Sequence, residues 1–180
     1  MKFTGFLAGA ALALGLAAPA ALAQSKGVLP SSAAVFLKWG EVEGWTIYAD
    51  GGRNTCLIER VDAAENVIQM GLTQDHAHAY VGIFTRADIG IKKGDEQVFI
   101  ALHDDIYEGT ATKLTKHLPD GYTGGYVLTD NPDFVEDVKK SYQMIIFPEK
   151  EYALAVDLTG SLKAIEAARA CINLSVCYAN

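Results

Sequence analysis

Two histidines separated by one residue are the feature of this sequence that most directly suggests chemistry. They lie in Asp75-His76-Ala77-His78. On a β-strand, alternate side chains point to one face, so His76 and His78 could bind one zinc or copper ion together. His103, which two aspartates follow, could add a ligand if two turns meet. The alternative is that all three histidines are solvated in polar turns, a setting that suits the neighbouring aspartates.

The other polar groups lack the setting that catalysis requires. No Gly-x-Ser-x-Gly segment or comparable strand-to-helix serine is present for a histidine to activate. The carboxylate pairs Asp95-Glu96 and Glu136-Asp137 fall on a predicted loop and a predicted helix surface, where we expect them to be solvated. We therefore predict no catalytic residues and no cofactor.

Three tyrosines suggest ligand binding without catalysis. Tyr107, Tyr122 and Tyr126 lie in the second half of the chain, and exposed rings on a sheet face could bind a sugar, a peptide or a partner protein. The alternative is that these rings pack in the hydrophobic core.

Residues 1–23 read as a signal peptide. Lys2 provides a basic start, Phe6 to Ala18 is apolar, and Ala21-Leu22-Ala23 matches the small-x-small pattern of a cleavage site. The apolar run is shorter than the roughly 20 residues that span a bilayer, which disfavours the alternative of an uncleaved anchor. We predict a mature chain that begins near Gln24 in the periplasm or outside the cell, with no further membrane span.

The size and charge of the mature chain restrict its class and its partners. Removing 23 of 180 residues leaves 157, which suits one domain. Loss of Lys2 changes the net charge from −7 to −8, and this acidic balance argues against nucleic acid and anionic membrane as partners. We expect an N-terminal lead segment over residues 24–38 and a single β-rich domain over residues 39–180. The first part of the lead should be loose, and its apolar patch from Ala33 to Leu37 should pack on the edge of the domain.

Hydrophobic periodicity predicts an α+β fold that is mainly β. Apolar residues alternate through 152–158, which indicates a strand, and then follow helical spacing after Gly160 at Leu162, Ile165, Ala168 and Cys171. A second helix is predicted after Pro132. We therefore expect an antiparallel β-sandwich-like domain with two short helices, the C-terminal one closing the fold. The other predicted strands cover 45–50, 55–61, 67–73, 77–85, 97–102, 106–113, 122–129 and 142–147.

Three cysteines in an oxidising compartment leave one without a partner. Pairing Cys56 with Cys171 would close a loop of 116 residues, which the chain-entropy model values at about 4 to 5 kcal/mol. Pairing Cys171 with Cys177 would close seven residues, valued at about 2 kcal/mol. We favour the long link because Cys177 falls in a predicted tail. The short link and a buried free thiol at Cys56 remain alternatives.

Several of these structural features together define a resemblance. They are Gly44-Trp45-Thr46-Ile47, Cys56, Asp157-Leu158-Thr159-Gly160-Ser161, and the run from Ala164 to Cys171. Over roughly residues 40–173 the chain resembles the invasion-associated locus B family of small exported bacterial proteins. It departs from that family at Tyr48, where members often carry another cysteine. The resemblance implies a periplasmic, β-sandwich-like domain linked by name to host-cell interaction, with no catalytic residues to carry over.

Three functions follow as expectations. The first is a non-catalytic periplasmic or exported binding or protein-interaction module, whose partner is an envelope or host protein. The second is a metal-binding protein or metalloenzyme that uses His76, His78 and His103. The third is a purely structural envelope component that forms a stable complex with another envelope protein.

Overall fold

The computed structural model describes residues 28–31, 33–88, 90, 95–114 and 121–178. The predicted signal peptide and Gln24 lie outside these residues. The described chain forms two helices and ten strands. In chain order they are β1 (Phe36–Val42), β2 (Trp45–Asp50), β3 (Thr55–Val61), β4 (Val67–Leu72), β5 (Ala79–Thr85), β6 (Asp95–Leu102), β7 (Asp105–Leu114), β8 (Thr123–Thr129), α1 (Asp133–Lys140), β9 (Gln143–Ile146), β10 (Leu154–Asp157) and α2 (Ser161–Tyr178).

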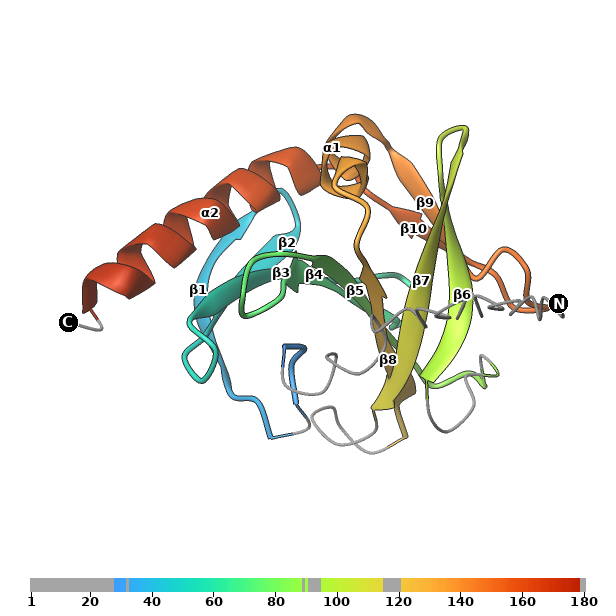
Figure 1. Cartoon of the computed structure of the whole chain (residues 1–180), viewed down its shortest axis with the longest axis horizontal. Coiled ribbons are helices and arrows are strands. Elements are labelled where there is room, and N and C mark those ends of the chain that lie inside the picture. The colour runs from blue at the N-terminus through green and yellow to red at the C-terminus, as the bar shows by residue number, and fades with distance from the viewer. Residues whose placement is uncertain (1–27, 32, 89, 91–94, 115–120, 179–180) are drawn as a thin grey trace, which may run out of the picture.

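All ten strands belong to one antiparallel sheet. Its order is β1-β2-β3-β4-β5-β8-β7-β6-β9-β10, so β1 and β10 are the two edge strands. The expected α+β, mainly β class is confirmed, with antiparallel strands and a C-terminal helix. In Figure 1 strands β2 to β5 form an arch, and the long hairpin of β6 and β7 rises beside it.

Apolar side chains gather on both faces of this bent sheet. On one face the main core joins residues of β2–β10 to both helices, with Trp45, Ile47, Val81 and Phe134 among its fully buried members. A smaller cluster on the other face contains Leu57, Val67, Tyr80, Phe84 and Tyr126, and Leu29 from the N-terminal segment packs against it. The sheet therefore needs a cover on each side, as alternating strands with two apolar faces require.

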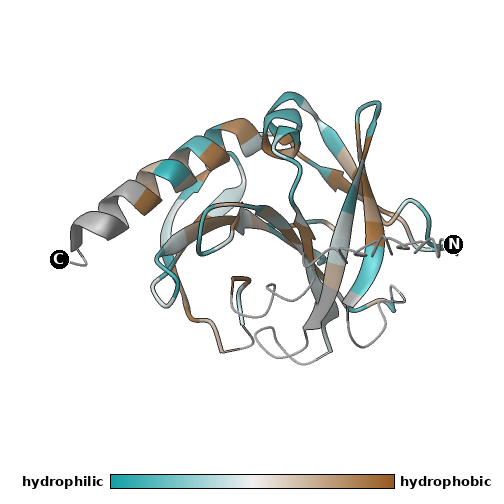
Figure 2. Ribbon diagram, in the orientation of Figure 1, coloured by the Kyte–Doolittle hydropathy of each residue, from teal (hydrophilic) through white to brown (hydrophobic). Residues whose placement is uncertain are grey.

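Helix α2 covers the main core because its small residues face the sheet. Ala164, Ala168 and Cys171 are buried, whereas Leu162, which the helical spacing also placed inward, is exposed. Figure 1 shows α2 lying across the half of the sheet that contains β1 to β3. Figure 2 shows hydrophobic and hydrophilic residues in turn along α2, as expected for a helix packed on one side.

The start of α2 depends on a glycine. Gly160 has φ of +81°, and a Cβ there would lie 2.6 Å from the Cβ of Glu43 in the β1–β2 turn. Its carbonyl accepts the N–H of Ala164 over 3.1 Å. The Ser161 hydroxyl donates to the Val138 carbonyl over 3.4 Å. The helix also runs to Tyr178, beyond the short helix expected from the sequence.

The N-terminal part of the domain differs from the expected division. Strand β1 begins at Phe36, so the predicted boundary between residues 38 and 39 lies inside a strand. Helix α1 follows Pro132 as predicted. Asn131 accepts the Asp133 N–H over 2.9 Å, and the side chains of Phe134 and Val138 are buried.

Candidate functional site

His76 and His78 lie in the turn between β4 and β5, since β5 begins only at Ala79. His76 has φ of 57°, in the left-handed region. Asp75 holds the turn by accepting hydrogen bonds from the Thr73 hydroxyl and the Ala77 N–H. The Thr73 hydroxyl is the main cause that lowers the pKa of Asp75. The strand geometry that would present both imidazoles on one face is therefore not present.

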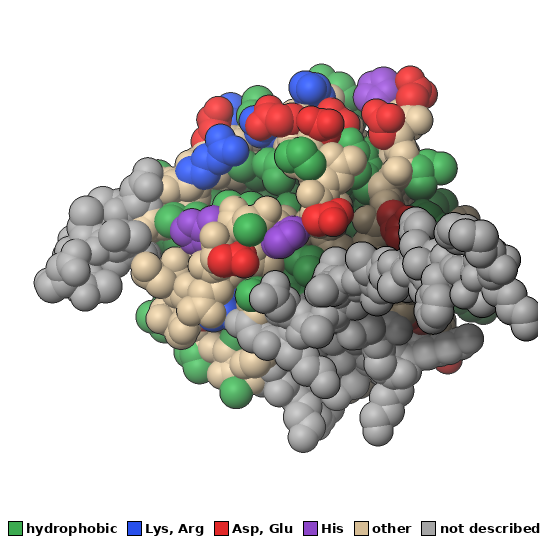
Figure 3. Space-filling model, viewed as in Figure 1, with side chains coloured by type: hydrophobic (Ala, Val, Ile, Leu, Met, Phe, Trp, Pro, Cys, Tyr) green, Lys and Arg blue, Asp and Glu red, His purple; other side chains and the backbone are tan. Residues whose placement is uncertain are grey.

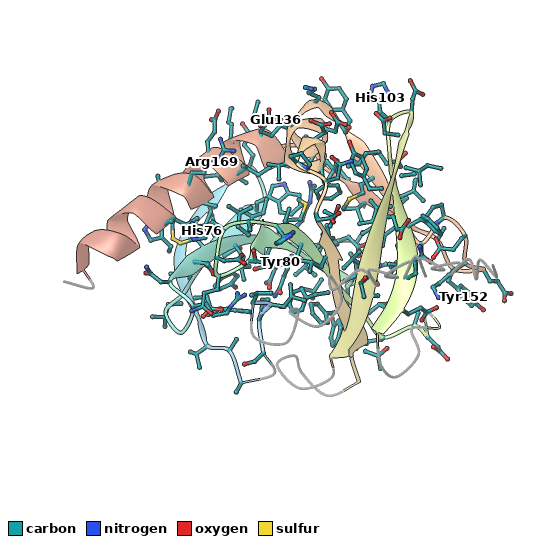
Figure 4. All side chains as sticks on the ribbon, viewed as in Figure 1. His76, Tyr80, His103, Glu136, Tyr152 and Arg169 are labelled. Atoms are coloured by element: carbon teal, nitrogen blue, oxygen red, sulfur yellow. A yellow bond between two sulfur atoms is a disulfide. The ribbon has the colours of Figure 1, made fainter. Side chains whose placement is uncertain are left out.

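His103 occupies a different turn, between β6 and β7. Its side chain is exposed and lies 3.7 Å from the exposed Asp104 carboxylate. Figure 4 shows His76 and His103 in well-separated parts of the molecule. Within the described residues, no group of three or more histidine, cysteine, aspartate or glutamate side chains could hold a metal ion.

Two of the three singled-out tyrosines are buried and hydrogen-bonded inside the domain. The Tyr107 hydroxyl donates to Asp137 of α1; burial and this bond raise the pKa of Tyr107, and the bond lowers that of Asp137. The Tyr126 hydroxyl donates to Gln69 over 2.6 Å, and its ring meets Tyr80 edge-on at 5.1 Å. Both rings therefore pack and hydrogen-bond within the domain.

Tyr122 is the more accessible of the three. Its hydroxyl donates to the Glu65 carbonyl over 2.8 Å, and the Arg86 guanidinium lies over its ring at 5.0 Å. Both contacts tie the start of β8 to neighbouring turns, so this ring is also used within the domain.

An apolar cavity lies between β3–β5 and the two helices. Its volume is about 60 Å³, less than half of the roughly 150 Å³ of a cavity that takes benzene. The lining includes Cys56, Met70, Phe134 and Ala168. The cavity is too small for a ligand of more than a few atoms.

An acidic hollow of about 300 Å³ lies beside α1 and the β6–β7 turn. It is lined by Asp105, Asp133, Glu136 and Asp137, among others. Figure 3 shows acidic and basic side chains close together over this end of the molecule. Glu136 pairs with Lys139 at 2.5 Å, and Asp137 accepts from Tyr107, so two of these carboxylates already have partners.

The disulfide between Cys56 and Cys171 connects β3 to α2. The sulfurs are 2.02 Å apart, and both residues are buried. The sequence favoured this pairing. The structure therefore differs from both alternatives, which were a link from Cys171 to Cys177 and a free thiol at Cys56. The side chain of Cys177 lies outside the described residues.

The most unusual exposed surface is a row of three apolar side chains at the edge of the sheet. Val35 is 69% exposed, Leu37 is 64% exposed and Trp39 is 43% exposed. We call these three residues the β1 stripe. Strand β1 pairs with β2 on one side, and no strand of the described residues pairs with its other side, which is an edge of the sheet.

The register of β1 places Leu37 on the face of the main core and Trp39 in an irregular part of the strand. Leu37 lies opposite Ala49, which packs against the main core. Pairing shifts between Lys38 and Gly40, so Trp39 is an extra residue in a β-bulge, and Gly40 lies opposite Ile47 of the main core.

A groove of about 360 Å³ adjoins the β1 stripe. It is lined by Val35, Leu37 and the β2–β3 turn from Asp50 to Arg53, with residues that precede β1. The buried Arg53 Nε donates to the buried Asp50 carboxylate over 2.7 Å, and its Nη1 donates to the Val28 carbonyl over 2.9 Å. This ion pair fixes one wall of the groove.

The sequence predicts that Ala33 to Leu37 pack on the edge of the domain, but it does not predict strand β1 or the exposure of Leu37 and Trp39. A signal was present, since Val35, Leu37 and Trp39 occupy alternate positions, the period of a strand.

In the described part of the chain, no helix is both long enough and apolar enough to cross a membrane. A comparison of the sequence and the structure with protein families, curated proteins and solved structures found no significant match. The resemblance to the invasion-associated locus B family therefore stays a prediction.

Proposed function

We propose that this chain is a non-catalytic, exported binding module of the invasion-associated locus B kind, which recognises a protein of the envelope or the host. The observation that carries the proposal is the β1 stripe. It combines an edge strand of the sheet with three exposed apolar side chains and an adjoining groove.

An edge strand is a ready surface for binding another chain. Its outward N–H and C=O groups can pair with an added strand, while alternate side chains supply selectivity. Burial of exposed apolar side chains such as Leu37 and Trp39 adds about 25 cal/mol for each Å² removed from water. Both contributions favour an extended protein segment over a small molecule.

Export is supported by two features of different kinds. Residues 1–23 carry the pattern of a signal peptide. Cys56 and Cys171 form a disulfide, a bond that persists in oxidising compartments such as the bacterial periplasm.

Site-specific photo-crosslinking in intact cells tests the binding function. A photoreactive phenylalanine analogue at position 39 should form an adduct with another polypeptide, because Trp39 lies on the edge strand. The same analogue at Tyr142, which is 82% exposed and lies outside the β1 stripe, is the matched control. No adduct at position 39, or equal adducts at both positions, contradicts the proposal.

Metal analysis of the purified mature protein separates this function from the histidine alternative. We expect no stoichiometric zinc or copper. Bound metal that is lost on substitution His76→Ala would instead establish the metal-binding alternative.

A further inference from the structure

We infer that Val28, Leu29 and Pro30 form a strap over a second binding site, and that this site takes a carboxylate joined to an apolar chain, as in a medium-chain fatty acid. The site lies on the face of the sheet that carries the smaller apolar cluster. It is separate from the β1 stripe, so the inference goes beyond the proposed function and does not depend on it.

The strap is held against the sheet much as a ligand would be. It lies beneath the arch of β2 to β5 in Figure 1 and belongs to no helix or strand. The Val28 carbonyl accepts two hydrogen bonds, from Arg53 Nη1 over 2.9 Å and from the Gln74 N–H over 3.1 Å. The Leu29 side chain is 8% exposed and packs in the smaller cluster with Tyr80. The strap therefore presents one oxygen and one apolar side chain to the sheet.

Three polar side-chain atoms on this face are buried and have no hydrogen-bond partner within the described chain. They are Arg53 Nη2, Thr55 Oγ1 and Tyr80 Oη, and each residue is at most 8% exposed. The Arg53 guanidinium lies over the Tyr80 ring at 5.8 Å. Thr55 shares its face of β3 with Leu57 of the smaller cluster, because alternate residues of a strand point to one side. Native proteins pair nearly all such groups, so this face is built to receive a polar guest.

The donors beneath the strap match a carboxylate. Arg53 Nη1 holds the single oxygen of Val28, and Nη2 beside it has no acceptor among the described residues. A carboxylate in the place of the Val28 carbonyl can bind both nitrogens at once. Burial raises the pKa of Tyr80 to about 12, against the opposing charge of the nearby Arg53. The Tyr80 hydroxyl therefore keeps its proton at pH 7 and can donate it, as the Thr55 hydroxyl can.

Asp50 explains why the hydroxyl donors matter as well as the arginine. The Asp50 carboxylate accepts Arg53 Nε over 2.7 Å and the Gly52 N–H over 3.1 Å. A ligand carboxylate therefore brings a second negative charge to one guanidinium. The hydroxyls of Thr55 and Tyr80 offset part of this charge, so the site needs them for affinity.

The apolar chain of the ligand takes the place of Leu29. The smaller cluster around this side chain contains Leu57, Val67, Tyr80, Phe84 and Tyr126. A groove of about 360 Å³ borders Arg53 and continues along Ser31 and Ala33. A chain longer than the leucine side chain thus has space beside the site, which favours a medium-chain acid over a very short one.

Isothermal titration calorimetry of the mature chain, residues 24–180, tests the inference with octanoate as the probe. Octanol has the same apolar chain without the carboxylate, and we expect it to bind at least about tenfold more weakly. Because the strap and the ligand compete for one site, Leu29→Ala should lower the dissociation constant for octanoate by at least about threefold. Leu162→Ala, at a leucine that is 44% exposed on α2, is the matched control and should leave it unchanged.

Two conservative variants test the hydroxyl donors. Tyr80→Phe and Thr55→Val each remove a buried hydroxyl that has no partner among the described residues, so neither should lower the melting temperature. Each should raise the dissociation constant for octanoate by at least about fivefold and leave that for octanol unchanged. Tyr142→Phe, at a tyrosine that is 82% exposed, is the control and should alter neither value.

Each contrary outcome overturns a stated part of the inference. Equal binding of octanol and octanoate overturns the carboxylate, and octanoate affinity that Leu29→Ala leaves unchanged overturns the strap. Failure of octanoate to bind either the wild type or Leu29→Ala overturns the site. Binding of an amidated peptide with the sequence of residues 25–31, without binding of octanoate, would show a polypeptide site and overturn the fatty acid. Photo-crosslinking at position 39 is independent of all these results, so the proposed function stands or fails separately.

Discussion

Trp45 and Thr159 connect the two ends of the folded domain. The Trp45 indole N–H, on a fully buried side chain at the start of β2, donates to the Thr159 carbonyl just before α2 over 3.0 Å. Arg60 reinforces this contact, because its guanidinium lies over the Trp45 ring at 5.7 Å and its Nη1 donates to the same carbonyl over 3.0 Å. The sequence placed both residues within the resemblance but did not predict that they meet.

Replacing Trp45 with phenylalanine tests this connection. Trp45→Phe keeps an aromatic ring but removes one hydrogen bond and part of the packing, so we expect the free energy of unfolding to fall by about 1 to 3 kcal/mol. The Arg60 guanidinium still satisfies the Thr159 carbonyl, which favours the lower end of this range. Urea unfolding followed by circular dichroism measures the change. Tyr152→Phe, at an exposed position, is the control and should change stability by less than about 0.5 kcal/mol.

The disulfide should carry a large part of the stability. The double substitution Cys56→Ser and Cys171→Ser releases a link between residues 115 positions apart, and the chain-entropy model gives a loss of about 4 to 5 kcal/mol. Urea unfolding with and without reductant measures it. Reductant should destabilise the wild type and leave the double variant unchanged. Cys177→Ser should respond to reductant as the wild type does; insensitivity of this variant would contradict the Cys56–Cys171 link.

The sequence predicted the closing part of the domain well because several local signals agree there. Gly160 marks the change from a strand period to a helical period, and Cys171 has the spacing of the buried face. Strand β1 was harder to predict. Lys38 separates Leu37 from Trp39 as alternation requires, but the apolar Phe36 precedes Leu37 and Gly40 interrupts the pattern at the bulge.

The three histidines do not form one site, and the residue spacing within each segment could not have predicted this. Whether His76 and His103 meet depends on which strands are neighbours in the sheet. The order β4-β5-β8-β7-β6 places strand β8 between the β4–β5 turn and the β6–β7 hairpin. Strand order is set by long-range packing, and residue spacing within one segment does not encode it.

Close strand packing makes Gly124 irreplaceable. A Cβ at this position of β8 would lie 1.9 Å from the Ile83 carbonyl oxygen and 2.7 Å from the Phe84 Cα, both backbone atoms of β5. Backbone cannot move aside as a flexible side chain can, so Gly124→Ala should lower stability by about 3 kcal/mol or more. For a chain of this size the melting temperature should fall by roughly 6 °C or more.

Gly51 provides the matched control for this clash. A Cβ there would have no atom within 4 Å, so Gly51→Ala should stay within about 0.5 kcal/mol of the wild type. Equal melting temperatures for Gly124→Ala and Gly51→Ala would show that β5 and β8 do not approach as closely as described.

Glu59 should make the stability of the domain depend on pH. It lies on β3, where its carboxylate accepts the Gln69 Nε2–H over 2.7 Å, and Gln69 in turn accepts the Tyr126 hydroxyl. Burial raises the pKa of Glu59, and the bond from Gln69 opposes that shift only in part. The folded protein therefore holds the Glu59 proton more tightly than the unfolded chain does.

The sign of the effect follows from this difference in proton affinity. The contribution of Glu59 to stability is fully present below the unfolded pKa of about 4.3 and is lost as the pH rises through the higher folded pKa. Glu59→Gln is neutral at every pH and keeps an oxygen that can accept from Gln69. We therefore expect this variant to be more stable than the wild type at pH 7, with a difference that shrinks as the pH falls toward 4.

Urea unfolding at pH 4.5, 5.5 and 7 measures this difference directly. Glu108→Gln, on the exposed side of β7, is the matched control and should differ from the wild type by less than about 0.5 kcal/mol at each pH. If the advantage of Glu59→Gln stayed constant or grew toward pH 4.5, ionisation of a buried carboxylate would not be its cause. A variant less stable than the wild type at pH 7 would instead mean that the bond from Gln69 needs the charged carboxylate, and that this bond outweighs the burial of the charge.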